Sequence, residues 1–333
     1  MKRKIIRAAG MGFGVLLLAV AGGLLFVTTA LPDAGPPPGI RVKGTAAQVA
    51  RGRYLANHVA VCMDCHSLRD HSRFPGPVLA GSLGGGGEKF SREQGFPGNF
   101  YAPNITPYAL GDWTDGELYR AITAGVSKSG APLFPLMPYH NFGQLDDRDV
   151  HAIIAYLRTL PAVQKDVPAS EADFPVNLVM RTLPARGRPQ RRPDEADVPA
   201  YGRYLTVAAG CGECHTQKVQ GKPVAGMAFA GGMEFPMPGG ILRSPNLTPD
   251  RQTGLGRWTA TAFVQRFKSY ADPAYRAPAV GADGYHTPMP WTLYGGMREA
   301  DLLAIYAYLR SLPPVRHQVV RYEPRVGGAH GGK

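Results

Sequence analysis

The chain has 333 residues and a formal net charge of +12. Its apolar fraction of 44% excludes a disordered chain, and its length is enough for two domains with cores of their own. The 42 glycines and 31 prolines indicate long irregular loops between few helices. No basic block with interleaved aromatic residues indicates nucleic acid, so the surplus charge suits an acidic protein partner, a lipid surface or plain solvation.

The chain begins with a basic cluster followed by a long uncharged run. Residues 1–10 carry four Lys or Arg side chains, and Met11 to Leu31 is a stretch of 21 residues without a charge. That length spans a bilayer and exceeds the apolar core of a cleaved signal peptide, which is roughly 7–15 residues. We therefore expect an uncleaved anchor rather than a signal segment. The basic residues predict that residues 1–10 are cytoplasmic and that the rest lies on the periplasmic side of the inner membrane.

A pentapeptide that ends in histidine occurs twice, as Cys62 to His66 and as Cys211 to His215, and the two copies contain all four cysteines. In an exported protein a C-x-x-C-H run is typical of covalent haem attachment. The two thiols add to the haem vinyl groups, and the histidine binds the iron as its proximal ligand. The sequence therefore predicts two covalently bound haem c groups. The attachment residues are Cys62, Cys65, His66, Cys211, Cys214 and His215.

A zinc site, a redox dithiol and a chance match all fit these cysteine pairs less well than haem. A structural zinc ion needs four ligands, and neither pair has a second Cys or His pair at suitable spacing. A thioredoxin-like dithiol needs a βαβ context, which the sequence lacks. Chance explains one C-x-x-C-H run, but not two that leave no cysteine over.

Segments on both sides of each pentapeptide are also repeated. A Gly-Arg-Tyr-Leu run precedes it, and a Pro-Asn-Ile/Leu-Thr-Pro run and a helical segment with Ala-Tyr-Leu-Arg follow. In that closing helix the apolar residues recur at i, i+3, i+4 and i+7, the spacing of a helix with one buried face. The repeated segments start at Gly52 and Gly202, at Pro103 and Pro245, and at Ala155 and Ala307.

The repeat predicts an all-α fold with two tandem haem domains and long irregular loops, preceded by a transmembrane helix. Capping residues are predicted at Thr45, Thr114 and Asp146. A stretch rich in Pro, Arg and acidic residues separates the domains, and a Gly-rich end predicts a mobile tail. The predicted segments are 1–10 cytoplasmic, 11–31 anchor or signal, 45–163 first domain, 164–197 linker, 198–317 second domain and 318–333 tail.

The sixth iron ligand decides between electron transfer and catalysis, because an added methionine closes the iron and raises its reduction potential. Met137 and Met289 both precede a proline and an aromatic residue, and both lie 19 residues before the tyrosine of the closing helix. We therefore predict that they are axial ligands. His140 and His286 each lie three residues away and could give a bis-histidine iron instead, but they fall on opposite sides of the methionine.

Two further features near the predicted haem sites have weaker interpretations. Trp113 and Trp258 stand at matching positions, where packing is the common role, although an indole N–H can bond a haem propionate. The run Gly84 to Gly87 lacks the Lys-Ser/Thr of a phosphate loop and is interpreted as a flexible connection.

Together these motifs resemble the membrane-anchored multi-haem cytochrome c subunits of periplasmic dehydrogenases that oxidise alcohols, aldehydes, gluconate and related sugars. The resemblance covers nearly everything from Gly52 to Val315 and includes both C-x-x-C-H sites and both Met-Pro-aromatic steps. It implies two cytochrome c-like domains. Many of those subunits carry three haem domains, and the first repeat here has Tyr108 to Gly111 where the family has an Asp-x-x-Thr-Gly stretch.

The resemblance implies an electron carrier rather than an enzyme. Its partners would be a periplasmic dehydrogenase or another redox donor, and a terminal oxidase or quinone-linked complex. The competing function is a di-haem peroxidase with one haem open to substrate, which the two equivalent methionines disfavour.

Overall fold

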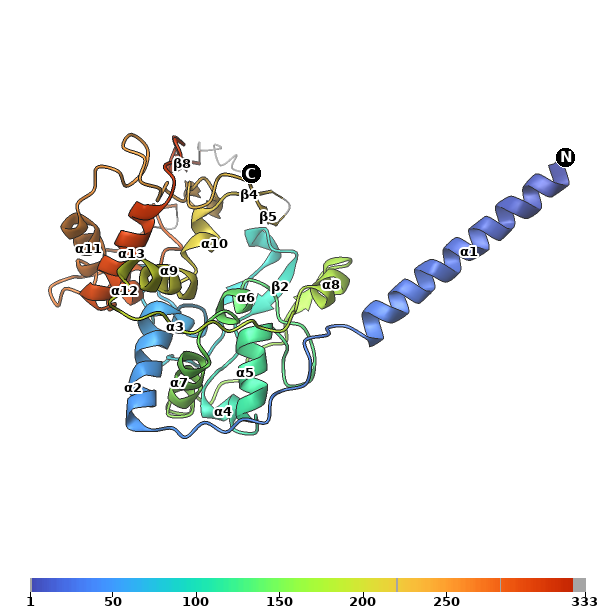
Figure 1. Cartoon of the computed structure of the whole chain (residues 1–333), viewed down its shortest axis with the longest axis horizontal. Coiled ribbons are helices and arrows are strands. Elements are labelled where there is room, and N and C mark those ends of the chain that lie inside the picture. Colours follow the sequence, from blue (N-terminus) through green and yellow to red (C-terminus); the bar gives the residue numbers. More distant parts are fainter. Residues whose placement is uncertain (1, 220, 282, 326–333) are drawn as a thin grey trace, which may run out of the picture.

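The computed structural model describes residues 2–219, 221–281 and 283–325. Figure 1 shows a long N-terminal helix that projects from a body built of two helical halves. This helix, α1 (Lys2–Thr29), is exposed along its length. Its segment Arg3–Thr29 is long and apolar enough to cross a membrane, a property that signal sequences share. The predicted apolar run is therefore helical.

The first half of the body pairs its first helix with its closing helix, and a glycine sets how closely they approach. A Cβ atom on Gly52 would lie 1.7 Å from the carbonyl oxygen of Ala152. The predicted caps of three helices are confirmed, because Thr45, Thr114 and Asp146 accept bonds from the backbone N–H groups that follow them. The elements are α2 (Ala46–Tyr54), η1 (Leu55–Val59), α3 (Cys62–Cys65), β1 (Lys89–Phe90), η2 (Arg92–Gln94), β2 (Gly98–Tyr101), α4 (Pro107–Leu110), α5 (Asp115–Ala124), α6 (Tyr139–Phe142) and α7 (Asp147–Leu157).

The second half repeats this plan. Gly202 in its first helix takes the place of Gly52, since a Cβ atom there would lie 1.9 Å from the carbonyl oxygen of Ala304 in the closing helix. These two contacts explain why a glycine begins the repeated Gly-Arg-Tyr run in both halves. The elements are α9 (Val198–Ala208), α10 (Cys211–His215), β4 (Lys218–Val219), β5 (Lys222–Pro223), β6 (Glu234–Met237), β7 (Gly240–Arg243), α11 (Ala260–Lys268), α12 (Trp291–Tyr294), α13 (Glu299–Ser311) and β8 (Tyr322–Pro324).

The segments predicted as linker and tail both contribute a strand to the half that precedes them. In the linker, β3 (Glu171–Ala172) pairs with β2, and α8 (Val176–Val179) and η3 (Met180–Thr182) follow. In the predicted tail, β8 pairs with β7, and residues 326–333 lie outside the described residues. The linker is thus folded onto the first half, as the start of the tail is onto the second.

Short antiparallel strands make the fold less purely helical than the all-α prediction. They form sheets in the orders β1-β2-β3, β4-β5 and β6-β7-β8. Equivalent glycines allow the outer strands to approach: a Cβ atom on Gly98 or Gly240 would lie 2.2 Å from a carbonyl oxygen of β3 or β8. Strands of two to four residues carry too little periodic pattern to be recognised in a sequence.

One hydrophobic core runs through both halves, and two equivalent hydrogen bonds link them. The hydroxyl of Tyr54 in α2 donates to Asp301 in α13, at 2.5 Å, and the hydroxyl of Tyr204 in α9 donates to Asp149 in α7, at 2.8 Å. The first helix of each half therefore bonds the closing helix of the other. Buried residues of both halves, from Leu55 to Leu309, belong to the same cluster.

Candidate haem sites

Each C-x-x-C-H run forms a short helix that follows a residue in the left-handed conformation. That residue is Val61, with φ of 42°, in the first half and Gly210, with φ of 63°, in the second. All four cysteines have free thiols. Burial raises the pKa of Cys62 and of Cys211 to about 12, so the thiols stay protonated. Thiols that stay protonated do not suit a redox dithiol, which needs a thiolate.

The histidine that ends each run is held by the same hydrogen bond. The Nδ1 atom of His66 lies 2.8 Å from the carbonyl oxygen of Pro103, and Nδ1 of His215 lies 2.9 Å from that of Pro245. A carbonyl partner fixes Nδ1 as the protonated nitrogen, which leaves Nε2 with its lone pair. Burial lowers the pKa of both histidines, that of His215 to about 4, so both rings are neutral at pH 7. This is the form and orientation of a metal-binding imidazole.

An asparagine next to each proline fixes the turn that presents this carbonyl. Asn104 is buried, and its Oδ1 accepts bonds from the backbone N–H and the hydroxyl of Thr106, at 2.9 and 2.7 Å. Asn246 makes the same two bonds to Thr248, at the same distances. The repeated Pro-Asn-Ile/Leu-Thr-Pro motif is therefore a support for the histidine. The repetition of the motif is visible in the sequence, but its contact with the histidine is visible only in the structure.

A glycine completes this support in each half. The backbone N–H of Gly86 donates to the carbonyl oxygen of His66 at 2.9 Å, and that of Gly231 donates to His215 at 2.8 Å. Both glycines have positive φ, and a Cβ atom on either would lie 2.5 Å from backbone atoms of the supporting turn. The interpretation of residues 84–87 as a flexible connection is therefore wrong, since Gly86 holds a fixed turn.

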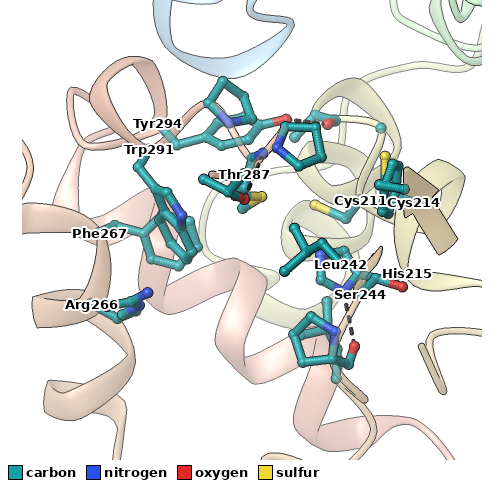
Figure 2. Close-up of a pocket in the computed structure, with 18 of the residues that line it drawn as sticks. Cys211, Cys214, His215, Leu242, Ser244, Arg266, Phe267, Thr287, Trp291 and Tyr294 are labelled. Atoms are coloured by element: carbon teal, nitrogen blue, oxygen red, sulfur yellow. Dashed lines mark hydrogen bonds between the residues drawn. The ribbon is translucent and has the colours of Figure 1, made fainter. Parts of the chain in front are cut away.

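The second half contains a cavity beside its C-x-x-C-H run. Figure 2 shows Cys211, Cys214 and His215 on one side of it and Trp291 and Phe267 on another. The cavity and its open mouth together enclose about 1030 Å³ of space not filled by atoms. Its lining is mainly apolar, and Met289 belongs to it. The cavity therefore brings both cysteines, the histidine and the predicted methionine ligand of the second half together.

The two Met-Pro-aromatic steps have the same backbone geometry. In each, the backbone N–H of the aromatic residue donates to the carbonyl oxygen of the methionine at 2.8 Å. The backbone angles of the proline also agree, with φ and ψ of −79° and 54° at Pro138 and of −80° and 63° at Pro290. Met137, like Met289, packs against the core that also contacts the haem cysteines. Ligation of an iron by either methionine stays a prediction.

The remaining sequence candidates lie elsewhere. Trp258 is partly exposed and is not among the residues that line the cavity, whereas Trp291 is. His140 binds Glu213 across the halves at 3.1 Å. His286 is buried beside Phe74, and its Nε2 has no partner among the described residues.

These residues fit covalent haem better than a metal held by side chains alone. Within the described residues, no group of three or more His, Cys, Asp or Glu is placed to hold a metal ion. Each half instead offers two free thiols one helical turn apart and a neutral imidazole whose Nε2 keeps its lone pair, the donor set of haem c.

Comparisons with known proteins agree with this donor set. Residues 199–313 match the family described as Cytochrome c. The fructose dehydrogenase cytochrome subunit of Gluconobacter japonicus is 30% identical over 80% of this chain and 52% of its own length. The gluconate 2-dehydrogenase cytochrome c subunit of Pantoea cypripedii is 31% identical over 80% of this chain and 60% of its own length.

A third relative has nearly the length of this chain. The diheme cytochrome c-type protein of Cereibacter sphaeroides is 28% identical over 93% of this chain and 99% of its own length. The chain spans only about half to three-fifths of the two dehydrogenase subunits. The chain therefore contains a matched cytochrome c domain at residues 199–313, and it is similar to proteins named as cytochrome subunits of fructose and gluconate dehydrogenases.

Proposed function

We propose that this chain is a membrane-anchored di-haem cytochrome c that carries electrons on the periplasmic side of the inner membrane, from a dehydrogenase to the respiratory chain. One observation carries the proposal. The histidine of each C-x-x-C-H run meets a proline carbonyl at 2.8 or 2.9 Å, so both halves prepare an imidazole for the same task. A chance C-x-x-C-H run has no reason to be supported by a second, matching motif.

The residues of each half divide the work of holding the group. Cys62 and Cys65, or Cys211 and Cys214, would each form one thioether bond, which fixes the haem in position. His66 and His215 would bind through Nε2, while Nδ1–H stays with the proline carbonyl. Haem c supplies an iron that gains or loses one electron. Met137 and Met289 would each give the iron a second protein ligand, which would exclude substrates from it.

The partner assignment rests on the relatives. Two of them are named as cytochrome subunits of fructose and gluconate dehydrogenases, which supports a periplasmic dehydrogenase as the donor. A terminal oxidase or quinone-linked complex would be the acceptor. The apolar helix α1 supports attachment to the membrane through a single N-terminal anchor.

The haem count and the redox partner can both be tested on the purified full chain. Mass spectrometry should give the chain mass plus two haems, and the ferrous protein should pass electrons to an added quinone-linked or oxidase-containing membrane fraction. A mass increase of one haem or none contradicts the di-haem assignment. Rapid reaction with hydrogen peroxide at a high-spin haem would favour the peroxidase instead.

A further inference from the structure

The linker carries an exposed apolar surface beside the end of α1. Phe174 is 78% exposed, and Val179 and Leu183 follow within ten residues at 50% and 44%. Outside α1, Phe174 is the only exposed phenylalanine among the described residues. Single exposed apolar side chains are ordinary, but a cluster that includes an almost free aromatic ring marks a contact surface. We name residues 174–183 the linker patch.

The linker patch is tied to the last turn of α1 by one side chain. The guanidinium group of Arg181 donates to the carbonyl oxygens of Val27 and Thr28, at 2.8 and 2.9 Å, and also to that of Leu31. The carbonyl oxygens of the last helical turn have no backbone N–H donor within the helix, because α1 ends at Thr29. Arg181 therefore supplies the hydrogen bonds that these carbonyl oxygens lack, and it fixes the position of the linker patch along the axis of α1. Figure 1 shows α8 on the side of the body that faces α1.

The length of the apolar run sets where that height lies in a membrane. At 1.5 Å per residue, the helical run from Met11 is about 30 Å long, which is the thickness of the hydrocarbon core. If α1 spans the bilayer, Val27 to Leu31 lie at its outer boundary. A patch bonded to these residues cannot be far from the lipid headgroups.

The charge next to the linker patch suits such a surface. Arg186, Arg188 and Arg191 follow it and are exposed. None of the three forms a salt bridge with a carboxylate in the part of the chain that the structure describes. Arginines flanking an apolar segment are typical of chains that lie in the membrane interface, where cations are attracted to anionic headgroups.

We propose that the linker patch is a second membrane contact, in which Phe174, Val179 and Leu183 insert among the phospholipids around α1 and the arginines bind anionic headgroups. The proposal rests on the membrane anchoring given under Proposed function. Its consequence is geometric: one flexible anchor would leave the haem domains free to rotate, whereas two contacts fix the face that they present to a partner.

Thiol accessibility in the full-length protein tests the proposal. Phe174→Cys, Leu18→Cys and Val219→Cys variants are placed in nanodiscs of equal parts phosphatidylcholine and phosphatidylglycerol and treated with a charged, water-soluble maleimide. Leu18 lies within α1, and Val219 is exposed on β4 in the second half. We expect the thiol at position 174 to react at least about tenfold more slowly than that at 219, as a lipid-covered group does.

The outcomes separate this proposal from the anchor itself. A protected thiol at position 18 with a fast-reacting thiol at 174 overturns the linker patch and leaves the anchor standing. A fast-reacting thiol at position 18 overturns both. A wild-type measurement needs no added cysteine: a photoactivatable phosphatidylcholine in the nanodisc should form adducts on the tryptic peptide 166–181, and their absence contradicts the contact.

Discussion

The two halves hold their histidines in the same way but surround them with different charges. The bond from the imidazole to the proline carbonyl and the bonds that the asparagine Oδ1 accepts are the same in both halves. The cavity beside the second histidine, however, is lined by Arg266 and Arg321. Neither forms a salt bridge among the described residues, unlike Arg243 beside them, which binds two glutamates.

The first half has no arginine at the equivalent places. Arg321 directly precedes β8, and its carbonyl oxygen accepts a bond from the backbone N–H of Arg243 at 2.8 Å. If the register of the first sheet is extended by two residues, the position opposite Tyr101 is Ala169. Arg266 lies seven residues after the cap of α11, where α5 has Ala121. The support of the histidine is therefore common to the two sites, while the charge that tunes an iron differs. Two haems in identical surroundings would have the same reduction potential, whereas we expect these two to differ.

The largest test of the comparison is removal of one attachment site. The double variant Cys211→Ser with Cys214→Ser should lose one of its two haems and keep the other, because each pair of thiols serves only its own half. Mass spectrometry and the haem absorbance per chain give the count. The matched variant, Cys62→Ser with Cys65→Ser, should behave in the same way. Loss of both haems from either variant would show that the halves do not mature independently.

The reciprocal Tyr–Asp bonds should contribute equally to stability. Tyr54→Phe and Tyr204→Phe each remove a hydrogen bond to a carboxylate, which costs roughly 1.5–3 kcal/mol of unfolding free energy. Urea unfolding of both variants measures this cost. Tyr270→Phe is the control, since the hydroxyl of Tyr270 has no hydrogen bond within the described ranges. A large cost at one tyrosine and none at the other would refute the equivalence.

Replacing the glycine that bonds the carbonyl oxygen of each histidine should lower the stability of the fold. Gly231→Ala places a methyl group 2.5 Å from the carbonyl carbon of Pro245 and forces an alanine into positive φ, so we expect a loss of more than about 1 kcal/mol in unfolding free energy. Gly86→Ala should cost a similar amount. Gly39→Ala is the control, because a Cβ atom there meets nothing within 4 Å. Substitution without cost at both sites would contradict the role of the supporting turn.

The arginines should separate the reduction potentials of the two haems. A nearby positive charge disfavours the oxidised iron more than the reduced iron, so the second haem should have the higher potential and hold the electron. Arg321→Gln should lower that potential by up to about 59 mV, a tenfold change in the one-electron equilibrium, and leave the first haem unchanged. Burial, and to a smaller extent the charge of Arg321, lowers the pKa of His215, so the field of this arginine reaches the ligand. Spectroelectrochemical titration of both proteins distinguishes the two haems.

The cap of the first closing helix, Asp146 of α7, should have the smallest effect on stability, and part of that effect depends on pH. The guanidinium of Arg148 holds the pKa of Asp146 well below its usual range, so the stability from this carboxylate is complete above about pH 4 and is lost as the pH falls further. Asp146→Ala should cost about 1 kcal/mol at pH 7 from loss of the cap. Asp146→Asn keeps the cap but loses the ion pair with Arg148, and with it the acid dependence. Unfolding at pH 7 and pH 3 measures both. An unchanged pH dependence in Asp146→Asn would count against this role.

Local signals in the sequence predicted much of this molecule. The caps at Thr45 and Thr114 and the periodic closing helices depend on residues three or four apart, and the structure confirms them. The strands β3 and β8 escaped prediction because their partners lie about 70 to 80 residues away. The place of Arg321 beside His215 follows from that pairing, so it could not be predicted either. The role of the Pro103 carbonyl likewise depends on a turn that only the fold brings to the histidine.

The most direct test of the central claim is the near-infrared spectrum of the ferric protein, compared with those of Met137→Ala and Met289→Ala. If both halves hold a His/Met haem, the wild-type protein shows a methionine-to-iron charge-transfer band worth two haems, and each variant loses half of it. A wild-type band worth one haem, or a band unchanged in either variant, would contradict a His/Met haem in each half.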